Sequence, residues 1–423
     1  MLDTDSTAPA SPPTRMPKRV KTLFLLSAAV GPGVMVMLAD TDAGSVITAA
    51  QSGAQWGYRL ILPQLLLIPV LYLVQEVTLR LGIVTKKGHG ELIREQFGLG
   101  WAILSVITLF LASVGALVTE FSGIAGIGNL FGLPTSFTVS AATLLLIAIG
   151  LSGSYHRVER IGVAVGLLEL LFIPAALLAH PHPQAVLSAL LTQPLTNSNY
   201  LFLLAANVGA VIMPWMVFYQ QGAVIDKGLR KRNLRAARFD TLGGSIMTQV
   251  IMIAVILTVA ATIGIRGSHQ SLSNISQIFH ALDPLLGPTI SKYIFGFGFL
   301  GASFLAALVV SVAGAWGIGE AFRFNHSLNH RFKDAKAFYL VYTAAHIGGA
   351  MIVISSVNLV SLTIDVEVMN AMLLPIVLGF LLALEAKALP SAWRMKGWYK
   401  YCVWTISGII MTFGVYMAVV TLL

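Results

Sequence analysis

The sequence predicts an all-α polytopic membrane protein with about eleven transmembrane helices. Of its 423 residues, 56% are hydrophobic and only 11% are charged, whereas a soluble domain carries roughly 25% charged residues. The mean hydropathy of +0.81 excludes a soluble enzyme. Glycine and proline are scattered through long apolar runs, which favours helices over a β-barrel, whose strands alternate in segments of about ten residues.

The predicted spans follow from the apolar runs, because a helix needs about 20 residues to cross the hydrocarbon core. A Ser- and Pro-rich segment, residues 1–20, precedes them and is expected to be a disordered cytoplasmic tail. The single cysteine, Cys402, permits no internal disulfide. The spans are predicted at about 22–54, 60–83, 100–126, 136–152, 161–179, 200–222, 241–265, 292–320, 337–357, 367–386 and 401–423.

The basic residues predict how the chain is oriented. All but three of the 27 Lys and Arg lie before the first span, at a span end, or in loops that share one side of the membrane. The exceptions are Arg59, Arg266 and Lys292. Because basic loops stay cytoplasmic, we expect an inner-membrane protein with a cytoplasmic N-terminus and an extracytoplasmic C-terminus. The longest basic run, Lys227 to Arg238, is expected to be a solvated loop that meets anionic lipid headgroups.

Polar residues interrupt the first span near its middle. Asp40, Asp42 and Ser45 follow a Gly-Pro-Gly segment (31–33) in an otherwise apolar stretch. A charged residue at the bilayer centre costs about 2.5–3.5 kcal/mol. No Lys or Arg lies deep in any predicted span to neutralise the two carboxylates. The pattern favours a cation site at a broken helix.

The sixth span is also interrupted, at Pro214, which removes a backbone hydrogen-bond donor and follows Gly209. Unwound backbone at membrane depth survives only where it faces protein or a water-filled cavity. Breaks at corresponding places in two halves predict inverted repeats with a substrate site at the midplane. The expected organisation is a first repeat over 21–180, a second over 200–387, and an additional helix over 400–423.

These residues resemble the Nramp family of divalent metal transporters over nearly the whole chain. The family's Asp-Pro-Gly-Asn motif aligns with Asp42-Ala43-Gly44-Ser45, and its Ala-x-x-Met-Pro-His motif aligns with 210–215, which read Ala-Val-Ile-Met-Pro-Trp. Further matches are at 90–95, 119–123 and 129–134. The resemblance implies a LeuT-like fold of five plus five inverted helices, with helices 1 and 6 broken, followed by an eleventh helix.

The resemblance also implies a set of metal ligands. Asp42 supplies a carboxylate, Met213 a thioether and Ala210 a backbone carbonyl, and Ser45 stands where the family has asparagine. A soft thioether helps such a site to admit manganese and iron while disfavouring calcium and magnesium.

Four further residues are expected in the outer shell of the metal or along its pathway. They are Asp40, two residues before Asp42, Glu120 in the third span, Trp215 in the sixth and Glu367 in the tenth. The alternative for Glu367 is a place in an external loop.

The chain departs from the family at positions expected to relay protons. The histidine after the proline is Trp215, which cannot take up a proton, and the aspartate three residues before Glu120 is Leu117. The pattern therefore resembles the Nramp-related magnesium transporter branch more than the proton-coupled core of the family. Ser45 and Ala43 are smaller than the family's residues and leave room for a hydrated ion, since magnesium keeps several waters.

The expected function is import of Mg²⁺, and of Mn²⁺, by alternating access without obligatory proton coupling. The first alternative is a proton-coupled manganese and iron importer in which Glu120, Asp40 or His346 relays protons. A sodium-coupled amino acid carrier and a membrane scaffold or sensor without flux are further alternatives. The sequence carries no nucleotide loop, nucleophile–base pair or cofactor motif, so it predicts no enzyme, no cofactor and no nucleic-acid partner. The oligomeric state is left open, and a monomer is compatible with the sequence.

Overall fold

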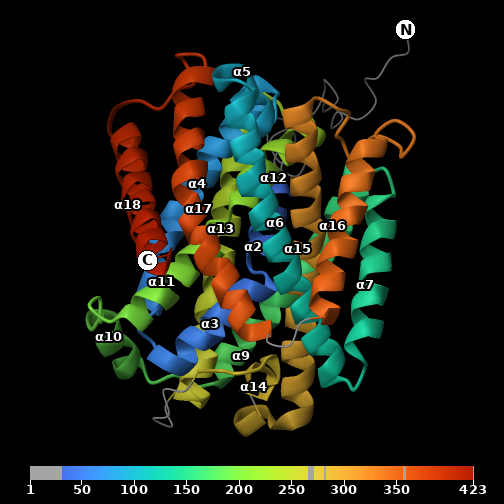
Figure 1. The fold of residues 1–423 in the computed structure, drawn as a ribbon. Helices are drawn as coiled ribbons and strands as arrows, with labels where there is room; N and C mark the ends of the chain where they lie inside the picture. Colours follow the sequence, from blue (N-terminus) through green and yellow to red (C-terminus); the bar gives the residue numbers. More distant parts are fainter. Residues whose placement is uncertain (1–30, 265–270, 281–282, 356–358, 423) are drawn as a thin grey trace, which may run out of the picture.

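The computed structural model describes residues 31–264, 271–280, 283–355 and 359–422. The predicted N-terminal tail, residues 1–20, and the beginning of the first predicted span lie outside these ranges. Every regular element in the described ranges is a helix, so the all-α prediction is confirmed. The long helices lie side by side in one bundle (Figure 1).

Nine helices of the described ranges are long and apolar enough to cross a membrane, and a bent pair makes a tenth. The nine are α4 (Ile61–Thr85), α6 (Leu99–Leu130), α8 with η1 and α9 (Tyr155–Gly166, Leu167–Leu171 and Phe172–Leu178), α11 with α12 (Ser198–Val211 and Pro214–Asp226), η2 with α13 (Lys231–Asn233 and Leu234–Thr262), α15 (Asp283–Phe322), α16 (Lys336–Ser355), α17 (Leu359–Ala388) and α18 (Gly397–Leu422). The expected span at 136–152 corresponds to α7 (Thr135–Gly150), whose 16 residues are fewer than a straight crossing needs. The count of eleven spans therefore stays a prediction.

Shorter helices lie at the two ends of the bundle. One end is called the basic face below and is defined by the segments at 86–94, 227–238 and 387–400. It carries α5 (His89–Phe97), whereas α10 (Pro183–Leu191) and α14 (Ile275–Phe279) lie at the opposite face (Figure 1).

The first span is broken, as the sequence predicts. α2 (Pro32–Asp40) and α3 (Ala43–Trp56) are bent by 48° around Thr41 and Asp42. Asp42 caps α3, because its Oδ1 accepts a 2.6 Å hydrogen bond from the Ser45 N–H, and an aspartate there satisfies an otherwise unpaired donor. The polar residues that are costly in a membrane thus also end one half-helix and start the next.

The sixth span breaks at the second motif. α11 ends at Val211, and α12 begins with Pro214 at its first position. Proline is well tolerated there, because the N–H that it lacks has no partner in the first turn of a helix. Ile212 and Met213 join the two halves in non-helical backbone and are 1% and 0% exposed. The unwound backbone is therefore enclosed by protein, as its depth in the bundle requires.

α17 packs against α11 just before this break. Gly209 permits the approach, because a Cβ on it would overlap the backbone carbonyl of Glu367 and stand 2.8 Å from the Ala371 nitrogen. A backbone carbonyl inside a helix cannot swing aside as a flexible side chain can. Glycine at this position therefore brings the Glu367 region of α17 against the broken sixth span.

The basic run from Lys227 to Arg238 is not a solvated loop throughout, which corrects the prediction. Lys227 is only 5% exposed and pairs with Glu159 of α8 at 2.8 Å. Arg238 lies inside α13 and pairs with Glu76 of α4 at 2.6 Å. The partners are 68 and 162 residues away in the chain, so the local sequence could not reveal these pairs.

A Gly209→Ala change should lower the midpoint of thermal unfolding of the purified protein by about 2–6 °C, because it overpacks two helix backbones. The matched control is Gly379→Ala in α17, where a Cβ meets nothing within 4 Å. Alanine favours the helix, so the control should leave the midpoint unchanged or raise it. Equal midpoints for the two variants would contradict the close approach.

Candidate cation site at the broken helices

Three of the four expected ligands meet directly where the two breaks face each other. The Ser45 hydroxyl lies 2.8 Å from the Asp40 carbonyl and 3.0 Å from the Ala210 carbonyl. The Ser45 N–H is the donor to the Asp42 carboxylate. A serine hydroxyl has only one hydrogen to donate, so it satisfies one of the two carbonyls at a time. A carboxylate, a hydroxyl and a backbone carbonyl are thereby gathered in one buried place.

Met213, the fourth expected ligand, lies in the break between α11 and α12. Its side chain is fully buried. The sulfur accepts a hydrogen bond from the Trp215 indole, with 2.9 Å between Nε1 and Sδ. Trp215 therefore does more than replace a protonatable residue, because it binds the thioether directly.

Glu120 of α6 reaches the same place from the side of α3. Its Oε2 accepts a 3.1 Å hydrogen bond from the Ala43 N–H, and its Oε1 accepts a 3.0 Å hydrogen bond from the Thr119 hydroxyl. Its carboxyl group also lies within hydrogen-bonding range of the Asp42 carboxyl. Two carboxylates this close repel each other unless a proton or a cation lies between them.

Glu367 lies inside α17 and not in an external loop. It is fully buried, and its Oε2 accepts a 3.0 Å hydrogen bond from the Asn370 amide. Its Oε1 lies so close to Gly44 that a Cβ on this residue would overlap it, and the Asp42 Oδ1 is 3.3 Å from the position of that Cβ. The missing side chain of Gly44 thus leaves the space in which the Glu367 and Asp42 carboxyls approach each other.

Glu169 is a fifth buried carboxyl group that the motifs did not single out. It lies in η1, the 3₁₀ segment between α8 and α9, within electrostatic range of Asp42 and Asp40. The only signal in the sequence was an acidic residue in the middle of the fifth predicted span. Asp40 lies within electrostatic range of both Asp42 and Glu367.

These five residues, called the acidic cluster below, have no basic counterpart in the described part of the chain. None of them is in an ion pair there. Several of their oxygens also lack a hydrogen-bond partner, namely Asp40 Oδ1, Asp42 Oδ2, Glu367 Oε1 and both oxygens of Glu169. Buried polar atoms almost always have a partner. The arrangement is therefore suited to a cation that is not part of the polypeptide.

The acidic cluster does not have the geometry of a resident metal centre. Within the described ranges, no three His, Cys, Asp or Glu side chains converge closely enough to hold a metal by themselves. A bound ion would instead depend on a few carboxylate oxygens, backbone carbonyls, the thioether and water. Such a mixed set suits an ion that must also leave.

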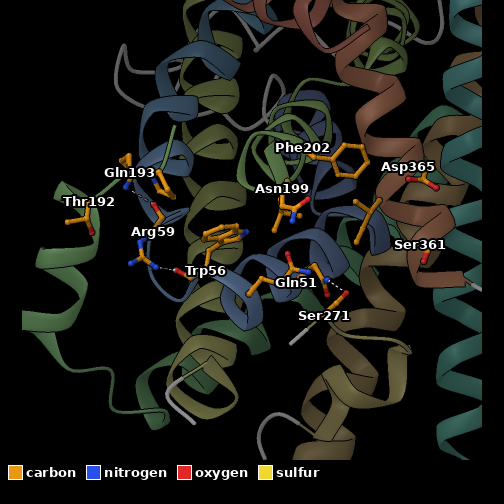
Figure 2. Close-up of a pocket in the computed structure, with 14 residues that line it drawn as sticks. Gln51, Trp56, Arg59, Thr192, Gln193, Asn199, Phe202, Ser271, Ser361 and Asp365 are labelled. Atoms are coloured by element: carbon orange, nitrogen blue, oxygen red, sulfur yellow. Dashed lines mark hydrogen bonds between the residues drawn. The ribbon is translucent and has the colours of Figure 1, made fainter. Parts of the chain in front are cut away.

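A cavity of about 900 Å³ opens at the opposite face of the bundle. Figure 2 shows Arg59 and Asp365 on opposite sides of this cavity, with Trp56 and Asn199 between them. Gln51 of α3 also lines it and is held by Ser271 and Leu272, at 2.5 Å from the Ser271 hydroxyl and 2.9 Å from the Leu272 N–H. The remaining lining residues are Gln55, Thr192, Gln193, Pro194, Phe202, Leu203, Ser361 and Ile364.

Neutral polar side chains lead along α3 from this cavity toward Ser45. Thr48 and Ser52 follow Ser45 at about one helical turn each. The Asn207 amide donates to the Ser52 hydroxyl at 2.9 Å and accepts from Gln64 at 2.7 Å. The Thr48 hydroxyl and the Gln64 carbonyl oxygen have no hydrogen-bond partner in the described ranges. This side of the acidic cluster therefore offers oxygen atoms without net charge.

The basic face is closed over the first turn of α2. The N–H groups of Gly31 and Gly33 donate to the Asp240 carboxylate at 3.2 and 2.7 Å. The Glu159–Lys227 pair packs onto Gly31, whose φ is 139° and where a Cβ would overlap Glu159. The start of α2 is thus held between α8, α12 and α13. Because every member of the acidic cluster is at most 2% exposed, the cluster is sealed from both faces.

Residues 33–420 match the family described as natural resistance-associated macrophage protein-like, Nramp. The chain belongs to the Nramp family. The matched range contains the breaks of both spans and the whole acidic cluster, so the family resemblance carried by the two motifs is confirmed. The narrower assignment of this Nramp protein to the magnesium branch stays a prediction.

Relatives and solved structures agree with this placement. Divalent metal cation transporter MntH 1 of Pseudomonas aeruginosa is 27% identical over 335 residues, which cover 74% of this chain and 75% of the relative. Divalent metal cation transporter MntH of Staphylococcus aureus is 26% identical over 62% of this chain and 61% of its own length. These relatives are named as transporters, in line with the expectation that the chain is not an enzyme.

Two solved structures are similar over nearly the whole chain. A manganese transporter of Eremococcus coleocola has a TM-score of 0.74 at 17% identity, covering 98% of this chain and 90% of that chain. A Na⁺-coupled sialic acid symporter has a TM-score of 0.61 at 14% identity, covering 92% of this chain and 89% of that chain. At these identities the similarity shows the fold alone, and it confirms the LeuT-like fold predicted for this Nramp protein.

A Lys227→Met change should loosen the closure of the basic face. It leaves the buried Glu159 carboxylate without its cation, which costs about 3–5 kcal/mol unless water enters. We expect faster backbone hydrogen exchange in α2, measured by mass spectrometry. The control is Lys87→Met, which breaks the exposed Lys87–Glu95 pair and should leave exchange in α2 unchanged. Unchanged exchange in both variants would show that the Glu159–Lys227 pair does not hold α2.

Proposed function

We propose that this Nramp protein imports Mg²⁺, and also Mn²⁺, by alternating access and without obligatory proton coupling. The observation that carries the proposal is the acidic cluster, in which five buried carboxyl groups surround a broken helix with no ion-pair partner in the described ranges. Acidic side chains without a partner at membrane depth are costly and typically mark an ion pathway. The names of the relatives, divalent metal cation transporters, support the same class of cargo.

In this proposal Asp42 supplies the principal charge, and Ser45, the Ala210 carbonyl and Met213 complete or flank the ligand set. Asp40, Glu120 and Glu367 lie in the outer shell and strengthen the negative potential. Water occupies the remaining positions, because magnesium dehydrates reluctantly and usually binds only one or two carboxylates directly. The absence of three converging acidic or imidazole ligands in the described ranges fits an ion that keeps part of its water.

The cavity of about 900 Å³ supports entry of a hydrated ion from the opposite face, which we take to be extracytoplasmic. The neutral oxygens of Thr48, Ser52 and Gln64 then line the approach to Ser45. The basic face is cytoplasmic in this orientation, and release requires α2 to part from Asp240 and from the Glu159–Lys227 pair.

The membrane potential is a sufficient driving force for inward transport. Two charges that cross a potential of about 100 mV release roughly 4.6 kcal/mol. Trp215 and Leu117 occupy the positions where proton-relaying groups are expected, and neither side chain takes up a proton. His346, a further relay candidate, is buried between the Tyr342 carbonyl at 2.9 Å and the Ser311 hydroxyl at 3.3 Å, which supports a structural role.

A proton-coupled manganese importer is the second candidate, and one contact favours it. Glu120 lies within hydrogen-bonding range of Asp42, so a proton shared by these two carboxyls would be displaced by an arriving cation. The solved structure of a manganese transporter shares the fold. The two candidates differ in whether protons move together with the metal.

Uptake into liposomes separates the two candidates. Purified protein is reconstituted, Mg²⁺ or Mn²⁺ is added outside, and metal entry is followed together with the internal pH. We expect Mg²⁺ to enter, to compete with Mn²⁺, and to leave the internal pH constant when the membrane potential is clamped. Entry of Mn²⁺ alone with matching acidification would overturn the magnesium proposal in favour of the proton-coupled importer.

An Asp42→Asn change should reduce uptake of both metals at least about tenfold, because a bound divalent ion loses its nearest charge-assisted ligand. The control is Asp334→Asn, which removes an exposed carboxylate at the basic face and should leave uptake within about twofold. The initial rate of uptake and the amount of folded protein are measured for both variants. Undiminished uptake by Asp42→Asn would place the site elsewhere.

A further inference from the structure

We propose that Trp215 sets the metal selectivity of the site by holding the sulfur of Met213 with its indole N–H. The inference rests on the proposed function, because it assumes that the site binds divalent cations. It assigns to Trp215 a positioning role that goes beyond the loss of a protonatable side chain at that place.

The geometry of the contact is specific. Nε1 of Trp215 lies 2.9 Å from Sδ of Met213, and both side chains have 0% exposure. The two residues are separated only by Pro214, the first residue of α12. Since the ring of proline restricts the backbone there, a single intervening residue holds the indole and the thioether in a defined relation.

The indole N–H needs this acceptor. A tryptophan side chain has one donor and no acceptor, and a buried indole N–H normally finds a partner. In the described ranges that partner is the Met213 sulfur. The hydrogen bond therefore satisfies a buried donor, and a metal that takes electron density from the sulfur must weaken it.

This competition falls unequally on different metals. Thioether sulfur is a soft ligand that favours softer divalent ions, whereas magnesium prefers oxygen ligands and water. A sulfur that accepts a hydrogen bond from an N–H group is a poorer ligand for Mn²⁺ or Cd²⁺. The same hydrogen bond has no effect on the binding of an ion that does not coordinate the sulfur. Trp215 thus lets the chain keep Met213 while reducing the advantage that the thioether gives to softer ions.

A purely packing role for Trp215 makes a different prediction. Trp215 is among the largest fully buried side chains, so its truncation is expected to disturb the surroundings in either case. Such a disturbance would change the transport of all divalent ions in the same proportion. The ratio between a soft and a hard ion therefore separates the two roles, whereas the absolute rate does not.

The test uses Trp215→Phe, which removes the N–H and keeps an aromatic ring. Initial uptake of Mg²⁺, Mn²⁺ and Cd²⁺ is measured in liposomes as a function of concentration. We expect the ratio of uptake efficiencies, Mn²⁺ to Mg²⁺ and Cd²⁺ to Mg²⁺, to rise about 3- to 10-fold, the range that corresponds to one hydrogen bond. The control is Trp316→Phe in α15, a similarly buried tryptophan that packs on Tyr219, which should leave both ratios unchanged.

A double substitution tests whether the effect passes through the sulfur. In a Met213→Leu background, Trp215→Phe should no longer change the ratios, because no thioether remains to be released. An unchanged ratio in Trp215→Phe alone overturns the inference, and so does an equal change with and without Met213. If the wild-type protein transports no divalent metal at all, the proposed function fails first, and the two failures are thereby distinguished.

A spectroscopic measurement covers the case in which Trp215→Phe does not fold. Binding of Cd²⁺ to the sulfur should weaken the hydrogen bond of the indole N–H and change the tryptophan emission of the wild-type protein, but not that of Met213→Leu. Cadmium is used because it does not quench fluorescence by paramagnetism as Mn²⁺ does. Saturation of Cd²⁺ uptake without any change in the wild-type emission would show that the sulfur–indole contact is unaffected by the metal.

Discussion

A group of carboxyl side chains buried at a broken helix is the constraint on which the rest of this structure depends. Asp40, Asp42, Glu120, Glu169 and Glu367 converge from α2, α3, α6, η1 and α17, and none is in an ion pair within the described ranges. A continuous helix could not present its backbone to the same place, so the interruptions of the first and sixth spans and the acidic cluster belong together. Gly44 and Gly209 make room for this arrangement. A side chain at Gly44 would overlap the Glu367 carboxyl, and a side chain at Gly209 would overlap the backbone of α17.

The local features of the sequence predicted the two helix breaks, whereas the contacts between distant segments could not be predicted. Each break lies within a few residues of the polar or proline residue that predicts it, namely Asp42, Ser45 or Pro214. In the structure, the Ser45 hydroxyl and the Ala210 carbonyl form a hydrogen bond between the two breaks. Glu169 was missed because its significance comes from neighbours more than 100 residues away. Glu367 was ambiguous because a span boundary is uncertain by several residues, and the pairs of Lys227 and Arg238 join separate helices.

In the proposed function, one residue that differs from the family motif links selectivity and coupling. The residue after Pro214 is tryptophan, which has no basic nitrogen and donates its only polar hydrogen to the neighbouring thioether. The same side chain would then remove a proton acceptor from the proposed pathway and occupy the thioether ligand. Both effects would favour a hard, hydrated ion driven by the membrane potential, and both would arise from the chemistry of a single ring.

The most direct measurement is the location of the ion itself. A crystal structure of the protein with Mn²⁺, with anomalous diffraction recorded at the manganese edge, identifies the ion independently of any transport assay. The account predicts a manganese peak at the break between α2 and α3, within reach of the Asp42 carboxylate and the Ala210 carbonyl. Excess Mg²⁺ should displace this peak. A peak confined to the cavity lined by Asp365, or no peak under conditions in which Mn²⁺ is transported, would contradict it.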